Sequence, residues 1–200
     1  MAPGRIVIVN GVPRAGKSSI VRAVQHSLPG QWINLGVDVL IEATPEALRP
    51  GIGLRPGGER PDLEPFVVKA YAALYESIAA HARMGLDVIT DVGHHDFYSK
   101  PLHILPDCAR RLSGLPVLFV GLDCPIDVIM RRRNADPEGY VAGEGVPAPV
   151  RRWQDEVHKP GIYDLRLDTA VMSPRRVVEA IAAALADPPS PSAFEQLAAL

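Results

Sequence analysis

A glycine-rich loop near the start of the chain has the residue types and spacing needed to bind phosphate. Residues Gly11–Ser18 read GVPRAGKS and satisfy the pattern G-x-x-x-x-G-K-[ST]. Its glycines let successive backbone N–H groups point at phosphate oxygens, and the N-terminus of the following helix reinforces them. Lys17 would bind the β- and γ-phosphates, and the Ser18 hydroxyl would coordinate magnesium. We therefore expect a nucleoside triphosphate and Mg²⁺ to bind here. The predicted nucleotide contacts are Gly11, Val12, Pro13, Arg14, Ala15, Gly16, Lys17, Ser18 and Ser19.

The segments on either side of this loop are those that a phosphate-binding loop requires. The apolar run Arg5–Asn10 is typical of a buried strand, and Ile20, Val24 and Leu28 recur at helical spacing after the loop. The alternative is a chance match in a glycine-containing turn, which this context disfavours. The loop alone predicts nucleotide binding and leaves turnover open, because binding modules and switches use the same loop.

An aspartate follows the third strand expected along the chain. Asp91 comes directly after the apolar run LDVIT, where P-loop proteins place the carboxylate that orients magnesium and its waters. The alternative is a strand-end aspartate that caps the next turn. We expect Ser18 and Asp91 to be the metal ligands.

A second aspartate lies at the end of the second expected strand. Asp38 in NLGVDVLIEA could accept the proton of an attacking hydroxyl near the γ-phosphate. It could equally be an N-cap for a helix that starts at Val39. The spacing does not separate these two roles, and both could hold together.

Two arginine clusters flank a segment rich in glycine, proline and alanine. Arg131–Arg133 precede it and Arg151–Arg152 follow it. Arginines on a mobile lid can neutralise the charge of a transferring phosphoryl group, whereas most charge runs are solvated helix faces. Three consecutive arginines on a helix cannot all face one site, so at most one or two would act.

Apolar strands alternate with helical patterns along the chain, which predicts an α/β fold with a mostly parallel sheet. Helices are expected across Leu63–Met84 and from Ser173-Pro174 onward. We expect one domain over residues 1–187, with a lid at about 131–152 and an acceptor-side loop at about 45–65, which is rich in proline and glycine. Residues 188–200 read as a Pro/Ser break before a short helix, Ala193–Leu200. The expected strands are Arg5–Asn10, Trp32–Val37, Asp87–Thr90, Pro116–Leu122 and Asp164–Asp168.

The composition excludes several classes of function. The formal net charge of -2 gives no basic face for nucleic acid. The longest apolar runs are too short to span a bilayer, and the N-terminus lacks a signal peptide, so we expect a soluble cytoplasmic protein with no membrane partner. Cys108 and Cys124 match no zinc pattern and are expected to be reduced thiols. Homo-oligomerisation is left open.

Several motifs together resemble the chloramphenicol phosphotransferase-like family. They are GVPRAGKSS, GVDVLIEA, the Asp-Val after the third strand, LPVLFVGLDCP, the arginine run, RWQDEVH and YDLRLDTA, spread from Arg5 to about Leu185. The resemblance implies a three-layer P-loop kinase-type fold with a five-stranded parallel sheet and a small lid. It also implies that the nucleotide is ATP and that the reaction is ATP-dependent phosphorylation of a hydroxyl on a small molecule, such as the antibiotic chloramphenicol. The family's catalytic base falls on Asp38, and its nucleotide-side lid arginine falls on Arg132, so Asp38, Lys17 and Arg132 are the expected catalytic residues.

The chain departs from the family's pattern on the expected acceptor side. Thr90-Asp91 leaves Asp91 as the magnesium carboxylate, and the stretch GHHDFYSK introduces His94 and His95. These histidines are candidates for contact with the acceptor, with a metal, or with solvent in a surface loop. His158 lies in the family's pattern without a role that the residues indicate. The alternatives in function are a nucleoside or sugar-nucleotide kinase and a non-catalytic ATP-binding regulatory module.

Overall fold

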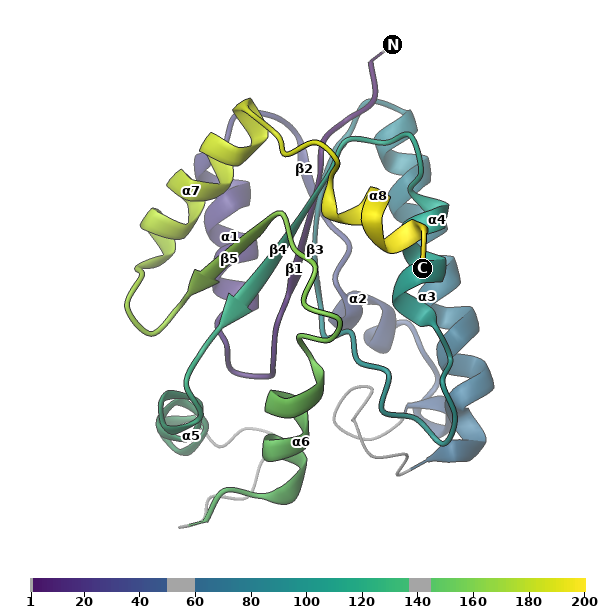
Figure 1. Cartoon of the computed structure of the whole chain (residues 1–200), viewed down its shortest axis with the longest axis vertical. Helices are drawn as coiled ribbons and strands as arrows, with labels where there is room; N and C mark the ends of the chain where they lie inside the picture. Colours follow the sequence, from purple (N-terminus) through teal and green to yellow (C-terminus); the bar gives the residue numbers. More distant parts are fainter. Residues whose placement is uncertain (1, 50–59, 137–144) are drawn as a thin grey trace.

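A five-stranded parallel sheet forms the middle of the molecule (Figure 1). The computed structural model describes residues 2–49, 60–136 and 145–200. The strand order is β2-β3-β1-β4-β5, and every pairing is parallel. The expected α/β fold is thereby confirmed. The strands are β1 (Ile6–Asn10), β2 (Trp32–Asn34), β3 (Asp87–Val92), β4 (Val117–Asp123) and β5 (Leu165–Asp168).

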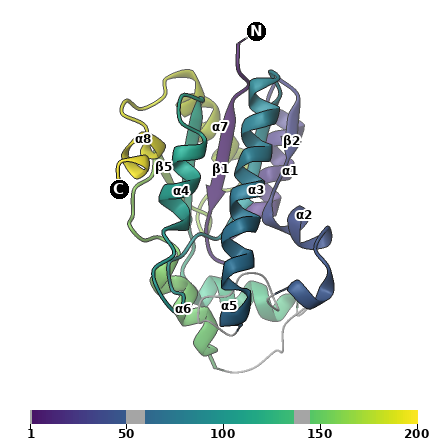
Figure 2. The ribbon, with the colours of Figure 1, turned by 90° about the vertical axis from the view of Figure 1, so that its right-hand side faces the viewer.

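The strands are nearly continuous apolar runs because helices cover both faces of the sheet. All five residues of β1 are buried. One face packs against α1 (Lys17–Ser27) and α7 (Pro174–Ala186). The other packs against α3 (Glu64–Arg83) and α4 (Ile104–Arg111), which lie side by side in Figure 2.

A short C-terminal helix, α8 (Ala193–Ala198), completes the second face. Ser192 and Glu195 form a capping box at its start, and Phe194 and Leu197 are buried. The Ala193 N–H donates to Asp164 Oδ1 at 2.7 Å, which ties the helix to the segment before β5. The expected terminal helix therefore packs on its own chain.

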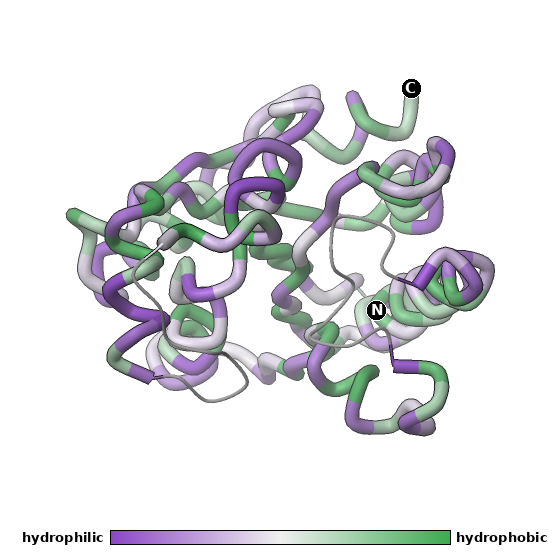
Figure 3. The backbone as a smooth tube through the Cα atoms, turned by 90° about the horizontal axis from the view of Figure 1, so that it is seen from below, coloured by the Kyte–Doolittle hydropathy of each residue, from purple (hydrophilic) through white to green (hydrophobic). Residues whose placement is uncertain are grey.

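Three helices and the loops between them lie at the carboxyl edge of the sheet, toward which all strands run. They are α2 (Val37–Glu42), α5 (Ile126–Ala135) and α6 (Ala148–Glu156). In Figure 3, which looks onto this edge, the segments in the middle are largely hydrophobic and the surrounding helices are mixed. This edge holds the phosphate-binding loop, because the loop joins the end of β1 to the start of α1.

The second strand is shorter than expected. It ends at Asn34, because the Asn34 side chain accepts a hydrogen bond from the Gly36 N–H and turns the chain into α2. The helix α4 was not predicted from the sequence, because Pro106 obscures the helical pattern of its short segment. The expected acceptor-side loop contains two short 3₁₀ turns, Glu46–Leu48 and Pro61–Leu63, and its residues 50–59 lie outside the described part. No helix in the described ranges is long and apolar enough to cross a membrane.

Candidate active site

The phosphate-binding loop leaves β1 at Gly11 and enters α1 at Lys17. A Cβ at Gly11 would lie 3.0 Å from the Leu122 carbonyl oxygen of β4, so a larger residue there would crowd the close approach of the loop to the sheet. Gly16 has φ of +96° at the N-cap position of α1, a conformation that favours glycine. These two glycines curl the backbone around the helix N-terminus, where an anion is favoured.

Lys17 is held at this loop by the loop's own backbone. Its Nζ donates to the carbonyl oxygens of Gly11 at 2.9 Å and Val12 at 3.0 Å. Burial lowers the pKa of Lys17, while the nearby carboxylates of Asp91 and Asp38 act in the opposite direction. The ammonium group is therefore poorly solvated, which strengthens its attraction for a phosphate anion.

Asp91 and Ser18 form a compact oxygen-donor pair beside the loop. Ser18 Oγ donates to Asp91 Oδ2 at 3.3 Å. Burial raises the pKa of Asp91, Lys17 opposes this effect and Asp38 adds to it. Carboxylate and hydroxyl oxygens suit Mg²⁺, which binds to one or two carboxylates together with nucleotide phosphates. The donor set therefore fits the expected metal. Asp91 lies inside β3, one residue before its end, and does not follow the strand as expected.

Asp38 lies in the first turn of α2, facing the same cleft. The N-cap position belongs to Gly36, so the alternative role of Asp38 as an N-cap is wrong. A Cβ at Gly36 would lie 2.0 Å from Asp91 Oδ1, so this glycine lets α2 start directly against the Asp91 carboxylate. This close approach brings Asp38 near Asp91 and Lys17.

Arg132 and Thr169 support the loop from the side of β5. Arg132 Nη1 donates to the Arg14 carbonyl oxygen at 3.1 Å, and its Nη2 donates to the Thr169 carbonyl oxygen at 2.7 Å. Thr169 Oγ1 in turn donates to the Ala15 carbonyl oxygen at 2.8 Å. Arg131 points away, is 69% exposed and pairs with Asp127. Sequence reasoning missed Thr169, although it follows directly after the last strand in LDTA.

A cleft of about 790 Å³ collects these groups at the carboxyl edge of the sheet. The structure thus brings together Lys17, Ser18, Asp38, Asp91 and Arg132. Most of the loop lines the cleft, while Gly11, Val12 and Ala15 support it from behind. The remaining lining residues are Pro13, Arg14, Gly16, Ser19, Ile20, Arg22, Val37, Ile41, Tyr71, Gly93, Ala135, Asp136, Trp153, Thr169, Met172 and Pro174.

The two adjacent histidines do not line this cleft, and both are buried. His94 is 2% exposed; its Nε2 bonds to the Tyr75 hydroxyl at 2.7 Å, and its ring stacks on Tyr71 at 4.7 Å between centroids. Burial lowers the pKa of His94 to about 3, so the ring is neutral. His95 stacks on Tyr98 and meets Trp153 edge-on. The structure therefore does not place His94 and His95 where they could contact an acceptor in this cleft. The alternative of a solvent-facing loop is wrong, because both side chains are buried.

Comparison with known proteins shows what this architecture is similar to. The sequence matches the family described as chloramphenicol phosphotransferase-like protein over residues 4–186. The chain belongs to this family. Two Mycobacterium tuberculosis proteins, from strains CDC 1551 and H37Rv and named as candidate O-phosphotransferases, are each 25% identical over 98% of this chain and 89% of their own length.

Several solved structures with a fold similar to that of this chloramphenicol phosphotransferase-like family member are named as kinases. The Mycobacterium tuberculosis APS kinase CysC, in complex with AMPPNP and APS, has a TM-score of 0.65 and 18% identity, over 94% of this chain and 100% of that one. A sugar kinase from Janibacter sp. HTCC2649 has a TM-score of 0.61 and 22% identity, over 95% and 99%. The expected P-loop kinase fold is confirmed, and family and fold support a small-molecule phosphotransferase.

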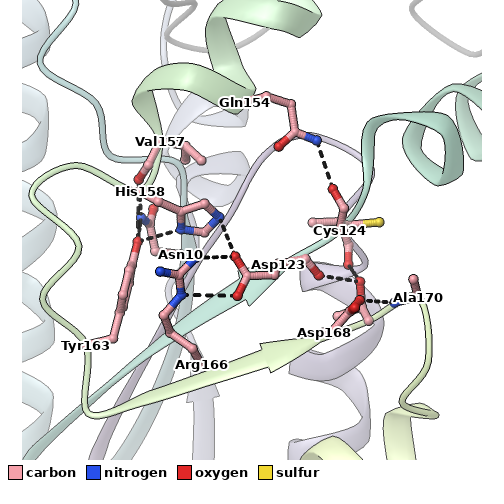
Figure 4. A network of polar contacts seen from close by, with 12 residues as sticks. Asn10, Asp123, Cys124, Gln154, Val157, His158, Tyr163, Arg166, Asp168 and Ala170 are labelled. Carbon is pink, nitrogen blue, oxygen red and sulfur yellow. Dashed lines mark hydrogen bonds and ion pairs between the residues drawn. The ribbon is translucent and has the colours of Figure 1, made fainter.

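In this family member, Asn10 joins the loop to α6 through a buried polar network (Figure 4). Asn10 Nδ2 donates to the Val157 carbonyl oxygen and to the Tyr163 hydroxyl, both at 2.8 Å. Its Oδ1 accepts from the His94 N–H at 2.7 Å. The sequence analysis did not single out Asn10, which ends β1 directly before the loop.

His158 belongs to the same network. Its contacts there give it a structural role, which the surrounding sequence motif did not indicate. Its Nδ1 bonds to the Tyr163 hydroxyl at 2.9 Å, and its Nε2 lies 3.5 Å from Asp123 Oδ1. Arg166 also pairs with Asp123, and burial lowers the pKa of His158. The ring thus links the end of α6 to the end of β4 (Figure 4).

Replacing Asn10 by leucine is expected to lower the free energy of unfolding by about 2–4 kcal/mol, because two buried backbone groups and the half-buried Tyr163 hydroxyl lose a hydrogen bond. Denaturant-induced unfolding measures this change. Arg166→Gln, which removes a half-exposed ion pair, serves as the control and should lower it by less than about 1 kcal/mol. An equal decrease in the free energy of unfolding of the two variants would contradict the stabilising role that we assign to the hydrogen bonds of Asn10.

Proposed function

We propose that the protein is an ATP-dependent O-phosphotransferase that transfers the γ-phosphoryl group to a hydroxyl of a small molecule. An antibiotic such as chloramphenicol is one candidate acceptor. The observation that carries this proposal is the placement of the Asp38 carboxylate in the same cleft as Lys17 and the Ser18–Asp91 pair. A nucleotide-binding module has no need for a further carboxylate facing the phosphates, whereas transfer to a hydroxyl needs a proton acceptor there.

In this proposal, one group of residues binds the nucleotide with its metal ion, and Asp38 acts on the acceptor. The loop amides, Lys17 and Arg132 would hold the triphosphate and neutralise the charge that spreads over the transferring group. Ser18 and Asp91 would hold Mg²⁺, which would supply further neutralisation of the negative charge on the nucleotide phosphates. Asp38 would orient the acceptor hydroxyl and accept its proton as the oxygen attacks the γ-phosphorus and ADP leaves.

The test is ATP consumption by the wild-type protein in the presence of a panel of hydroxyl compounds, with each product analysed by mass spectrometry. The panel contains chloramphenicol, sugars, nucleosides, shikimate and gluconate. We expect ADP release that depends on one class of acceptor and a product that carries one added phosphate. Tight ATP binding without a phosphorylated product from any acceptor would support a regulatory module and overturn the proposal. Preferential use of nucleosides would support the nucleoside-kinase alternative.

A further inference from the structure

A hydrogen-bond relay with one direction runs from the end of β1 toward the surface beside β4 and consists of Asn10, Tyr163 and His158 (Figure 4). Asn10 Oδ1 accepts from the His94 N–H, so Nδ2 is the donating end of this amide. Its two hydrogens go to the Val157 carbonyl oxygen and to the Tyr163 hydroxyl oxygen. The hydrogen of this hydroxyl then points to His158 Nδ1 at 2.9 Å, because the Val157 carbonyl oxygen is farther away, at 3.4 Å, and already accepts from Asn10.

The direction of this relay determines where the His158 ring carries its hydrogen. Since Nδ1 accepts from Tyr163, the neutral ring has its hydrogen on Nε2, which faces Asp123 Oδ1 at 3.5 Å. Burial raises the pKa of Tyr163 to about 12, so its hydroxyl keeps its hydrogen at neutral pH. A second proton on His158 would bind to Nδ1 and remove the acceptor that this hydroxyl uses. The relay is therefore complete only while His158 is neutral.

The groups around His158 keep its ring neutral at pH 7 and let it gain a proton in acid. Burial lowers the pKa of His158 below its ordinary value of 6.5, Asp123 on β4 opposes this effect, and Arg166 on β5 adds to it. Lys159 and Glu156, its charged neighbours in the sequence, pair with each other at 2.8 Å. The His158 side chain is 17% exposed, so a proton from solvent can reach it. A fall in pH from neutral therefore adds a charge at one end of the relay.

The helix α6 ends beside this relay and is held at two points next to cations of the predicted nucleotide site. Asn10 bonds to the carbonyl group at its C-terminal end, and it directly precedes the loop carbonyl group that accepts from Lys17 Nζ. One turn earlier on α6, Gln154 Nε2 donates to the Cys124 carbonyl oxygen at 2.8 Å. Arg132 Nη1 lies 3.4 Å from Cys124 Sγ. A shift of α6 would therefore move the supports of both Lys17 and Arg132.

We propose that His158 is a positioning residue for nucleotide binding, and that its neutral ring keeps α6 attached to the phosphate-binding loop. Protonation turns Nδ1 from an acceptor into a donor toward Tyr163. The hydroxyl then faces donors on two sides, and Asn10 loses its bond to it. The end of α6 and the loop move apart, Lys17 and Arg132 no longer converge on the phosphates, and the nucleotide binds more weakly in acid. This inference goes beyond the proposed function, because it rests on nucleotide binding alone and holds for any acceptor.

The variant His158→Asn tests this role, because its Oδ1 lies near the place of Nδ1 and can accept from Tyr163, yet it takes up no proton. The dissociation constant of a nonhydrolysable ATP analogue with Mg²⁺ is measured by calorimetry at about pH 7.5 and about pH 5.5, on either side of the ordinary histidine pKa. The variant should match the wild type at the higher pH. At the lower pH the wild-type affinity should fall about fivefold more, the scale of coupling between two sites. An equal fall in both proteins would overturn the proposal, because the nucleotide and every other titrating group are common to both.

Two further variants separate positioning from general stability. His26→Asn makes the same substitution at an exposed histidine on α1 outside the cleft, and it should keep the wild-type pH dependence. Tyr163→Phe removes the middle member of the relay, so nucleotide affinity should be low at both pH values and should no longer respond to His158. Wild-type affinity and pH dependence in Tyr163→Phe would show that the relay does not position the loop.

The fluorescence of Trp153 reports the position of α6 without any nucleotide. The chain has two tryptophans, so Trp32→Phe leaves Trp153 as the sole reporter. We expect its emission to change as the pH falls below about 6.5, and this change to be lost when His158→Asn is added. The His95 ring, 5.2 Å from the Trp153 ring, is present in both proteins, so an equal transition in both would overturn the proposed movement of α6. If the analogue binds at neither pH, the predicted nucleotide site is wrong, while this transition still decides whether His158 positions α6.

Discussion

Replacing Asp38 by asparagine is expected to lower kcat for acceptor phosphorylation about 10²- to 10⁴-fold, the range for loss of a general base. The amide keeps the size of the side chain and can still bond to the acceptor hydroxyl, yet it cannot take the proton. KM for ATP should change little, because in the proposed mechanism the loop, Lys17 and Arg132 would hold the triphosphate. Steady-state kinetics with the best acceptor, varying each substrate in turn, measure both effects.

A neighbouring carboxylate on α2 provides the control for Asp38. Glu42 lies at the end of this helix, is exposed and does not line the cleft. Glu42→Gln removes the same charge from the same helix and should leave kcat within about twofold, since exposed substitutions away from a site have small effects. Full acceptor-dependent turnover in Asp38→Asn would show that another group takes the proton.

Replacing Lys17 by methionine should lower kcat at least about 10³-fold and raise KM for ATP, whatever the acceptor, because the substitution removes a fixed cation from the transferring phosphate. The stability of the folded protein, in contrast to its activity, should be maintained or should rise. Since burial lowers the pKa of Lys17, the folded protein binds this proton less tightly than the unfolded chain, and the charged lysine destabilises the fold at neutral pH. Methionine removes that penalty, although it also loses the bonds to Gly11 and Val12.

Activity and stability of the Lys17 variant are therefore measured together. We expect loss of turnover with a Tm equal to or above that of the wild type, determined by thermal unfolding without nucleotide. Arg131→Met, which removes an exposed cation that points away from the cleft, is the comparison and should keep most of the activity. A Tm that falls by many degrees in Lys17→Met would assign the loss of turnover to unfolding instead of charge.

The nucleotide side of the site could be predicted from the sequence because its signals are local. The glycine pattern, the strand before it and the helix after it occupy one continuous stretch, and Asp91 follows from the next central strand. Asp38 also lies where a short strand gives way to a helix. The N-cap alternative was wrong by two positions, because the Asn34 side chain ends β2 early and Gly36 starts the helix.

The acceptor side could not be predicted in the same way because it depends on long-range packing. Tyr71 follows the apolar stripe of α3 and looks like a core residue in the sequence. Its place at the cleft and its stacking on His94 appear only when α2 and the Gly93–His95 segment are placed around it. Asn10 and Trp153 come together across more than half of the chain, and no spacing rule connects them. The histidines drew attention as polar residues, yet their contacts make them supports for two aromatic rings.

The helix α8 has a consequence for how the folded protein opens. With six residues, it is too short to persist alone and remains helical only while it is docked on α4 and β4. Its detachment would expose the parts of α4 and β4 on which it packs, while α3 and α4 would still cover the rest of this face. Cys108 lies in the same buried cluster as Phe194 and Leu197, and burial raises the pKa of its thiol. If α8 undocks locally, the Cys108 thiol would become more accessible, so thiol labelling would report how often this helix opens.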